Sequence, residues 1–476
     1  MGQALLKAWC WLALVTASAT SGLSDDAASG RRIFVQGGTS DELSATFGAG
    51  TTPLPPRLRR CAGCHGADGL GRREGGIGIP AITWRALTAP REATAARPGR
   101  PAYDRPALIR ALGEGIDPAG RRLASGMPRF RLSPTQAAAL IDYIGILGTE
   151  ADHDPGVTAD EIRIGAVLPL SGPAAAAGRA IRTGLENALA EAGAIYGRRL
   201  RLIAADGGND VNAALHALTA DDQVFALVAT MLPAGVERIE DEDVPVIGPL
   251  RPSVTHPASN MFDLLAPRED QMRVLVDELT ADVTRARRLV ICGADGSIAD
   301  AVADQARRRG ATIIRIADAA ELPALLSSRA PPSPDAIIAL PDIDFGRLAM
   351  ELADQPGGWL IAGAAEALTP AQATDERLRL VLPIWPASPH HADSSPLATA
   401  ASIVLIEGLK RMGARASRAG LIAALESLRE FPTGVLPPLT FSKSRHTGSS
   451  ASVVIRPDRS SGAVTLGTWR APRPFD

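Results

Sequence analysis

Residues 61–65 read Cys61-Ala62-Gly63-Cys64-His65, a C-x-x-C-H motif that decides the fold of the front part of this 476-residue chain. The spacing puts two thiols one helical turn apart, so both can bond to the two vinyl groups on one porphyrin edge while His65 reaches the iron. The motif therefore predicts one covalently attached c-type haem, tethered by Cys61 and Cys64 and ligated by His65.

Three other uses of a cysteine pair compete with this interpretation. A dithiol oxidoreductase would need a βαβ setting, whereas the flanking sequence is rich in proline and glycine. A zinc site would need two more Cys or His ligands nearby, and residues 66–150 contain neither. A structural disulfide is the third alternative.

A second axial ligand is expected downstream of the motif. Met127 is the only methionine between Cys61 and Glu150, and it stands just before a predicted helix that starts at residues 132–136 and continues over residues 137–147. A lone methionine usually fills a gap in a core, but a position in the loop before the last helix favours iron ligation. His65 and Met127 together would fill both axial positions, which predicts electron transfer and no catalytic residue.

Residues 30–150 resemble a class I cytochrome c domain through the C-x-x-C-H motif, Met127-Pro128 and the closing helix with Tyr143. The resemblance implies a small all-α domain, which we expect over residues 25–148. In that family a proline carbonyl after the haem helix accepts a hydrogen bond from the ligating imidazole. Pro80 matches that proline and is the expected partner of His65.

The N-terminal residues Met1–Gly22 predict a cleavable signal peptide. Lys7 precedes an apolar run over residues 8–15, and small residues follow up to Ala19, after which we expect cleavage. The run is shorter than the roughly 20 residues that span a bilayer, so we expect export to the periplasm without a permanent membrane span. The excess of 47 arginines over 3 lysines reflects genomic base composition, and we infer no nucleic-acid partner from it.

Beyond a polar linker expected at residues 149–160, strand and helix patterns alternate through residues 161–476. Such alternation predicts parallel sheets flanked by helices, and a second series of strands starting near Arg288 suggests two lobes. The expected strands are residues 162–168, 200–205, 224–230, 244–248, 288–292, 312–316, 336–340, 359–363 and 378–382.

This part resembles the type I periplasmic binding proteins of the branched-chain amino-acid family, through the opening Ile164–Gly172 segment and the helix that follows it. In that family a ligand lies between the lobes, against loops after the first, third and fourth strands. The resemblance implies ligand contacts from Ser171, Thr230 and either Ser253 or Thr255. The third loop, residues 229–234, lacks the Gly and Ser pairing of an amino-acid carboxylate site, so the sequence does not predict an amino acid and leaves open another small molecule or no ligand.

The remaining chemically notable side chains have structural interpretations. Cys292 lies in an apolar strand and is expected to be a buried small side chain. The pair His390-His391 and His446 have no neighbouring carboxylate or cysteine cluster in the sequence, so we expect solvent-exposed loop histidines. No Ser-His-Asp arrangement, paired-carboxylate motif or phosphate loop is evident.

These features predict a periplasmic one-haem electron carrier with a binding-protein-like domain for docking or ligand sensing. Fused chains of this kind resemble proteins associated with periplasmic quinoprotein oxidation of alcohols, which implies a quinoprotein dehydrogenase or another cytochrome as redox partner. The alternative is a solute receptor for a transporter or sensor, in which the haem senses redox state or supports structure. A haem enzyme would require that Met127 be labile.

Overall fold

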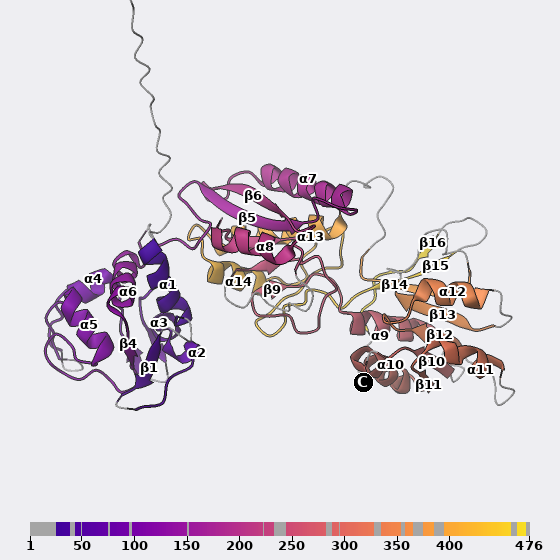
Figure 1. Ribbon diagram of the computed structural model, residues 1–476, viewed down its shortest axis with the longest axis horizontal. Helices are drawn as coiled ribbons and strands as arrows, with labels where there is room; N and C mark the ends of the chain where they lie inside the picture. Colours follow the sequence, from indigo (N-terminus) through magenta and orange to yellow (C-terminus); the bar gives the residue numbers. More distant parts are fainter. Residues whose placement is uncertain are drawn as a thin grey trace, which may run out of the picture. The chain divides into compact units, whose positions relative to one another are not determined.

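The computed structural model divides the chain into two compact units, residues 1–158 and 159–476 (Figure 1). The predicted signal segment Met1–Gly22 and the pair His390-His391 lie outside the described residues. Among the helices that are described, none combines the length and apolarity of a membrane span. The described residues are 25–38, 43–48, 50–74, 77–94, 98–149, 152–221, 223–232, 244–281, 288–294, 296–327, 335–353, 358–364, 375–384, 395–457 and 464–472.

The first unit is built mainly from helices, as predicted. Two short antiparallel ribbons, which the sequence pattern did not predict, accompany them: β1 pairs with β4 and β2 pairs with β3. In chain order the elements are α1 (Asp25–Gln36), β1 (Ser44–Phe47), α2 (Pro56–Arg59), α3 (Cys61–His65), β2 (Arg72–Glu74), β3 (Ile77–Ile79), α4 (Trp84–Thr88), α5 (Arg105–Gly113), β4 (Pro128–Arg131) and α6 (Pro134–Ile146).

The predicted closing helix is α6, and its start follows from local chemistry. The Ser133 hydroxyl accepts a hydrogen bond from the Gln136 amide at 3.2 Å, and the Gln136 side chain accepts one from the Ser133 amide at 2.9 Å. These two reciprocal hydrogen bonds satisfy backbone amides at the start of the helix, which have no carbonyl acceptor in a preceding turn. Helix α6 crosses α1 so closely that a Cβ on Gly30 would lie 2.0 Å from the Ala139 carbonyl oxygen. A larger residue than glycine at this crossing would therefore force the helices apart.

The segment after α6 packs onto the first unit, so the free connection is shorter than the linker expected over residues 149–160. The Tyr143 hydroxyl donates to Asp152 at 2.9 Å, and the Gly148 amide donates to the same carboxylate at 2.8 Å. Arg31 of α1 forms a largely buried ion pair with Asp154. Val157 is 5% exposed. The acidic side chains that made this stretch look like solvated linker are bound by partners on α1 and α6.

The first lobe of the second unit is a five-stranded parallel sheet in the order β6-β5-β7-β8-β9. Strand β5 is nearly continuous in apolar residues because helices cover both faces of such a sheet. Helices α13 and α14 come from the end of the chain and rejoin this lobe, where the Arg418 guanidinium donates to the Val224 and Phe225 carbonyls. The elements are β5 (Glu161–Leu168), α7 (Ala175–Ala192), β6 (Arg199–Asp206), α8 (Val211–His216), β7 (Ala226–Val228), β8 (Val246–Ile247), β9 (Met261–Phe262), α13 (Pro396–Met412) and α14 (Arg418–Glu426).

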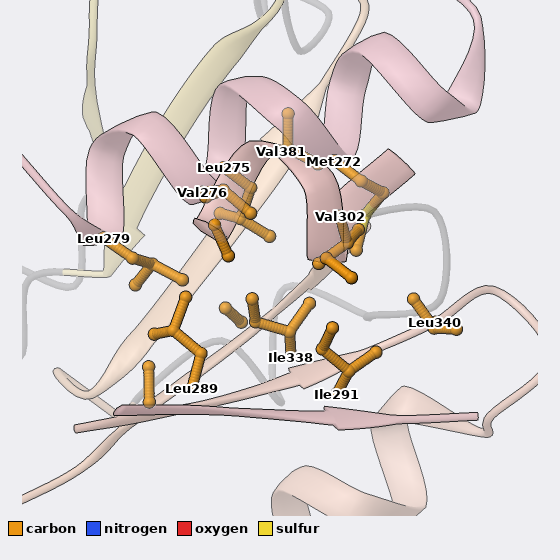
Figure 2. Packing of buried hydrophobic residues seen from close by; sticks show 14 of the residues in the cluster. Met272, Leu275, Val276, Leu279, Leu289, Ile291, Val302, Ile338, Leu340 and Val381 are labelled. Carbon is orange, nitrogen blue, oxygen red and sulfur yellow. The ribbon is translucent and has the colours of Figure 1, made fainter. Parts of the chain in front are cut away.

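The second lobe is a seven-stranded sheet in the order β11-β10-β12-β13-β14-β15-β16, parallel through β14 and antiparallel for the last two pairs. Figure 2 shows Leu275 and Leu279 of α9 and Val302 of α10 packed over Leu289 and Ile338 of the sheet. The elements are α9 (Arg268–Leu279), β10 (Arg288–Cys292), α10 (Gly296–Arg308), β11 (Thr312–Ile316), α11 (Leu322–Ser327), β12 (Ala336–Ala339), α12 (Phe345–Ala353), β13 (Leu360–Ala364), β14 (Leu378–Leu382), β15 (Val453–Pro457) and β16 (Val464–Leu466).

Two isolated side chains of the second unit can now be placed. Cys292 is fully buried on β10, as expected, and burial raises the pKa of its thiol to about 11. His446 was expected to be exposed, but it is 4% exposed. Its ring stacks on Phe262 at 4.3 Å between centroids, and its Nε2 lies 3.1 Å from the Glu426 carboxylate. These partners are 184 and 20 residues away in sequence, which is why the surrounding loop residues did not reveal them.

Candidate functional site

The C-x-x-C-H motif forms a single short helix, α3, in the first unit. Cys61 is half-buried and packs beside the core of this unit, whereas Cys64 is exposed, and neither thiol is in a disulfide. Burial raises the pKa of the Cys61 thiol to about 12. One helical turn therefore presents two free thiols next to His65, which is the donor set that thioether attachment of a porphyrin needs.

The His65 ring has a defined orientation. Its Nδ1 lies 2.8 Å from the Pro80 carbonyl oxygen. Because a carbonyl can only accept a hydrogen bond, Nδ1 carries the proton and the lone pair is on Nε2. Burial lowers the pKa of His65, although the bond to Pro80 acts in the opposite direction. The imidazole is thus held neutral, with Nε2 available to a metal.

The approach of Pro80 depends on a glycine that the sequence analysis did not single out. Gly71 has φ +76°, and a Cβ there would lie 2.4 Å from the Ile79 carbonyl oxygen. Its amide donates to the His65 carbonyl at 2.8 Å. The Gly-rich sequence after the motif therefore brings the Pro80 segment against the end of α3. Glycine is the residue expected where φ is positive, so Gly71 could have been noticed in the sequence. Many other glycines surround it, however, and nothing local distinguishes it from them.

Met127 lies in the loop that precedes β4 and the closing helix α6, as the sequence predicts. It is half-buried and packs against the core of the first unit. Its amide donates to the Ala124 carbonyl at 3.1 Å, and the next residue, Pro128, pairs with Phe47 of β1. The thioether is thus carried by a tight turn whose downstream end is a strand.

The same loop contains a buried carboxylate, Asp117, that the sequence analysis did not identify. The Asp117 carboxylate accepts hydrogen bonds from the Ala119 and Arg121 amides, both at 2.9 Å, and from the Arg121 guanidinium at 2.9 Å. Burial by itself would raise the pKa of Asp117, but these donors hold it below its ordinary value. Asp117 therefore organises the first half of the loop that leads to Met127.

In the second unit, the structure places Ser171 in the loop after β5, beside Asp206 at the end of β6. One oxygen of the Asp206 carboxylate accepts hydrogen bonds from the amides of Leu170, Ser171 and Gly208 at 2.9, 3.2 and 2.9 Å. Hydrogen bonds from the Gly208 amide and from the Leu170 and Ser171 amides hold the pKa of Asp206 below its ordinary value. The carboxylate thus ties two strand-end loops together.

Thr230 is fully buried after β7, and its hydroxyl is engaged within the sheet. The Val167 amide donates to the Thr230 Oγ1 at 2.7 Å. This bond joins the end of β5 to the loop after β7. The placement favours a structural role for Thr230, and a ligand contact from its hydroxyl stays a prediction.

Ser253 and Thr255 follow β8 in a loop held by a buried charge pair. Ser253 is 8% exposed. The Thr255 hydroxyl is exposed and lies 3.3 Å from the Glu269 carboxylate at the start of α9. The Arg251 guanidinium lies 3.3 Å from the Asp263 carboxylate, and burial raises the pKa of Asp263 in spite of that arginine. Thr255 is thus the more accessible of the two predicted side chains.

The described residues hold no further site built from the predicted side chains. Within the described part of the chain, no group of three His, Cys, Asp or Glu side chains lies close enough to hold a metal ion. A hollow of about 550 Å³ opens at the end of α14, but none of the predicted ligand residues lines it. It is lined by Ala423, Glu426, Ser427, Arg429, Ser442, Lys443 and Ser444.

Comparison with known proteins agrees with this division. Residues 58–147 match the family model of cytochrome c, and residues 161–316 match that of a periplasmic binding protein. No curated protein matches the chain.

Solved structures similar to the second unit share its fold at low identity. An ABC transporter substrate-binding protein from Sphaerobacter thermophilus is 16% identical, with a TM-score of 0.52 over 67% of this chain and 99% of that one. A fatty acid ABC transporter substrate-binding protein from Thermomonospora curvata is 18% identical, with a TM-score of 0.51 over 67% and 94%. A leucine binding protein from Thermotoga maritima is 18% identical, with a TM-score of 0.51 over 65% and 99%.

The chain is therefore a two-part protein, in which a cytochrome c domain is followed along the sequence by a domain with the periplasmic-binding-protein type I fold. A cytochrome c domain implies a covalently bound haem. The described residues fit such a group, because two free thiols lie on one turn and the Pro80 carbonyl leaves the His65 Nε2 unprotonated.

Proposed function

We propose that this protein is a periplasmic electron carrier with one haem, whose second domain docks a partner or senses a ligand. The observation that carries the proposal is the 2.8 Å contact between His65 and Pro80, in a helix that also presents two free thiols. A bound haem would supply a one-electron iron couple, with a potential raised by methionine ligation.

Each residue of the first domain has a distinct task in this proposal. Cys61 and Cys64 form the covalent bonds, and His65 offers Nε2 to the iron while the Pro80 carbonyl prevents the ring from turning. Met127 would offer its thioether as the second protein ligand of the iron. Because both ligands would come from the protein, we propose electron transfer and assign no catalytic residue.

The proposed partner is a periplasmic quinoprotein dehydrogenase that donates electrons, or another cytochrome that accepts them. Chains that fuse a cytochrome c domain to a binding-protein-like domain resemble proteins associated with quinoprotein oxidation of alcohols, and this resemblance supports the proposed partner. Charge also supports an acidic partner, because residues 20–150 contain 17 arginines against 12 acidic residues. A basic surface steers an acidic partner towards the haem domain.

The test is the visible spectrum of the purified mature protein, oxidised and reduced, followed by a pyridine haemochrome assay. We expect a c-type haemochrome at one haem per chain and, in the ferric state, the weak far-red band of sulfur-ligated iron. The variant Met127→Ala should keep the covalent haem and lose that band. Absence of haem after expression with haem-attachment machinery would contradict the proposal.

A second candidate function is solute binding for a transporter or sensor, with the haem in a redox-sensing or structural role. The fold of the second domain favours it, because the similar structures are substrate-binding proteins. Thermal unfolding of the full protein with leucine, a fatty acid or an alcohol would test this. A rise in the unfolding temperature of the second domain that does not depend on haem oxidation state would favour the receptor.

A further inference from the structure

One arginine, two residues after Met127, binds the second half of the loop that carries Met127. The Arg129 guanidinium donates to three carbonyl oxygens of this loop: Met127 at 2.6 Å, Leu123 at 3.1 Å and Ala124 at 3.2 Å. The planar fork of an arginine holds several acceptors in a fixed geometry, whereas a lysine ammonium is a point charge on a flexible stem. The two ends of the turn that presents the thioether are therefore bound to one rigid group.

A glycine provides the space for this arrangement. Gly115 has φ +70°, and a Cβ there would lie 1.9 Å from the Arg129 Nε. The Gly115 carbonyl also accepts a hydrogen bond from the Leu123 amide at 2.8 Å. The arginine side chain thus passes directly over the backbone where the loop begins.

Apart from the hydrogen bond between the Met127 amide and the Ala124 carbonyl, little else restrains the tip of the loop. Residues 124–126 are exposed, and a Cβ added to Gly126 would contact nothing within 4 Å. In the described residues no carboxylate pairs with Arg129, so the three carbonyl oxygens are the acceptors of its guanidinium. An exposed turn with few packing contacts opens at low free-energy cost unless hydrogen bonds close it.

We infer that Arg129 is the positioning residue for Met127: by binding the carbonyls of Leu123, Ala124 and Met127, it keeps the loop closed and the thioether in place. This inference rests on the proposed ligation of haem iron by Met127. Arg129 acts through the backbone of the loop and contacts no reacting atom. Its loss should let Met127 leave the iron more often without affecting attachment of the haem through Cys61 and Cys64.

The test compares Arg129→Gln with Arg131→Gln in the full haem-loaded protein. Arg131 is an exposed arginine of the same strand, so it is a matched control for loss of one positive charge. The probe is imidazole, which can bind ferric iron only when Met127 has left. We expect R129Q to bind imidazole at least about tenfold faster, because it loses the charge-assisted hydrogen bonds that close the loop. R131Q should bind it at the wild-type rate.

Two further measurements separate the possible failures. A c-type haemochrome in R129Q shows that the first domain folds and attaches haem. A far-red band that is weaker than in wild type, while the unfolding temperature of the second domain is unchanged, assigns the faster imidazole binding to release of Met127. If R129Q attaches no haem, Arg129→Lys takes its place, because it keeps the positive charge and removes the planar fork. A wild-type protein without the far-red band would refute the proposed ligation itself. A normal wild-type band with equal imidazole rates in R129Q and wild type would overturn only the role of Arg129.

Discussion

The haem helix of the first domain and two strand-end side chains of the second domain, Thr230 and Asp206, present their polar atoms in opposite ways. In α3, five consecutive residues offer two free thiols and an imidazole whose Nε2 lone pair is available. In the second domain, the Thr230 hydroxyl and the Asp206 carboxylate are already bound by backbone amides. A polar side chain after a strand is therefore weaker evidence for a ligand than a local motif whose donor atoms stay free.

The largest expected effect follows from removing the thiols. Cys61→Ala with Cys64→Ala should abolish covalent haem attachment, because no other cysteine of the chain lies near His65 in sequence. Extraction with acidified acetone measures this, since covalent haem stays with the protein. The control Cys292→Ala should keep its haem. Haem that resists extraction from the double variant would break the contrast between the two domains.

The helix crossing of the first domain should respond next most strongly. Gly30→Ala places a Cβ 2.0 Å from the Ala139 carbonyl oxygen, and we expect a loss of about 3 kcal/mol in the free energy of unfolding. Gly145→Ala on α6 meets nothing within 4 Å and should stabilise by about 0.5–1 kcal/mol. Urea unfolding monitored at the haem absorbance measures both. Equal midpoints for the two variants would contradict the packed crossing.

Thr230 offers the sharpest test in the second domain. Thr230→Val keeps the shape but leaves the buried Val167 amide without its acceptor, so we expect a loss of about 2 kcal/mol in stability. Thr255→Val, at an exposed hydroxyl, should change stability by less than about 0.5 kcal/mol. Thermal unfolding followed by far-ultraviolet circular dichroism compares them. Unchanged stability of T230V with loss of stabilisation by a bound solute would instead assign Thr230 to a ligand site.

The smallest effect concerns the Met127 loop and depends on pH. Asp117→Asn keeps one acceptor oxygen and loses the charge, so we expect a loss of about 1 kcal/mol at neutral pH. The pKa of Asp117 is lowered in the folded state, so its carboxylate stabilises the fold above the unfolded pKa. That contribution disappears as pH falls through the lowered folded pKa. The difference between wild type and D117N should therefore persist down to about pH 4 and shrink below it, as urea midpoints measured from neutral pH down to about pH 2, a range that covers this titration, would show.

Some of the site could be predicted from sequence because its signals are local. The C-x-x-C-H spacing lies within one helical turn, and the helix start at Ser133-Pro134 depends on residues three apart. The strand over residues 288–292 is present as β10 with the predicted bounds. The sequence could not predict the roles of Arg129, Gly115 and Asp117. Each role depends on the backbone groups that contact the residue, and those groups become neighbours only when the loop folds.

The sequence by itself determined the two-domain order, the haem helix and the alternation of strands and helices, because spacing within one turn and apolar periodicity are properties of neighbouring residues. Tertiary structure decided which polar atoms were already occupied: Asp152 and Asp154 bind the first domain, His446 is buried against Phe262, and Thr230 bonds the sheet. These pairings join residues from nine to 184 positions apart. Burial makes each unpaired polar group costly, so the folded chain selects such partners, and no local pattern encodes them.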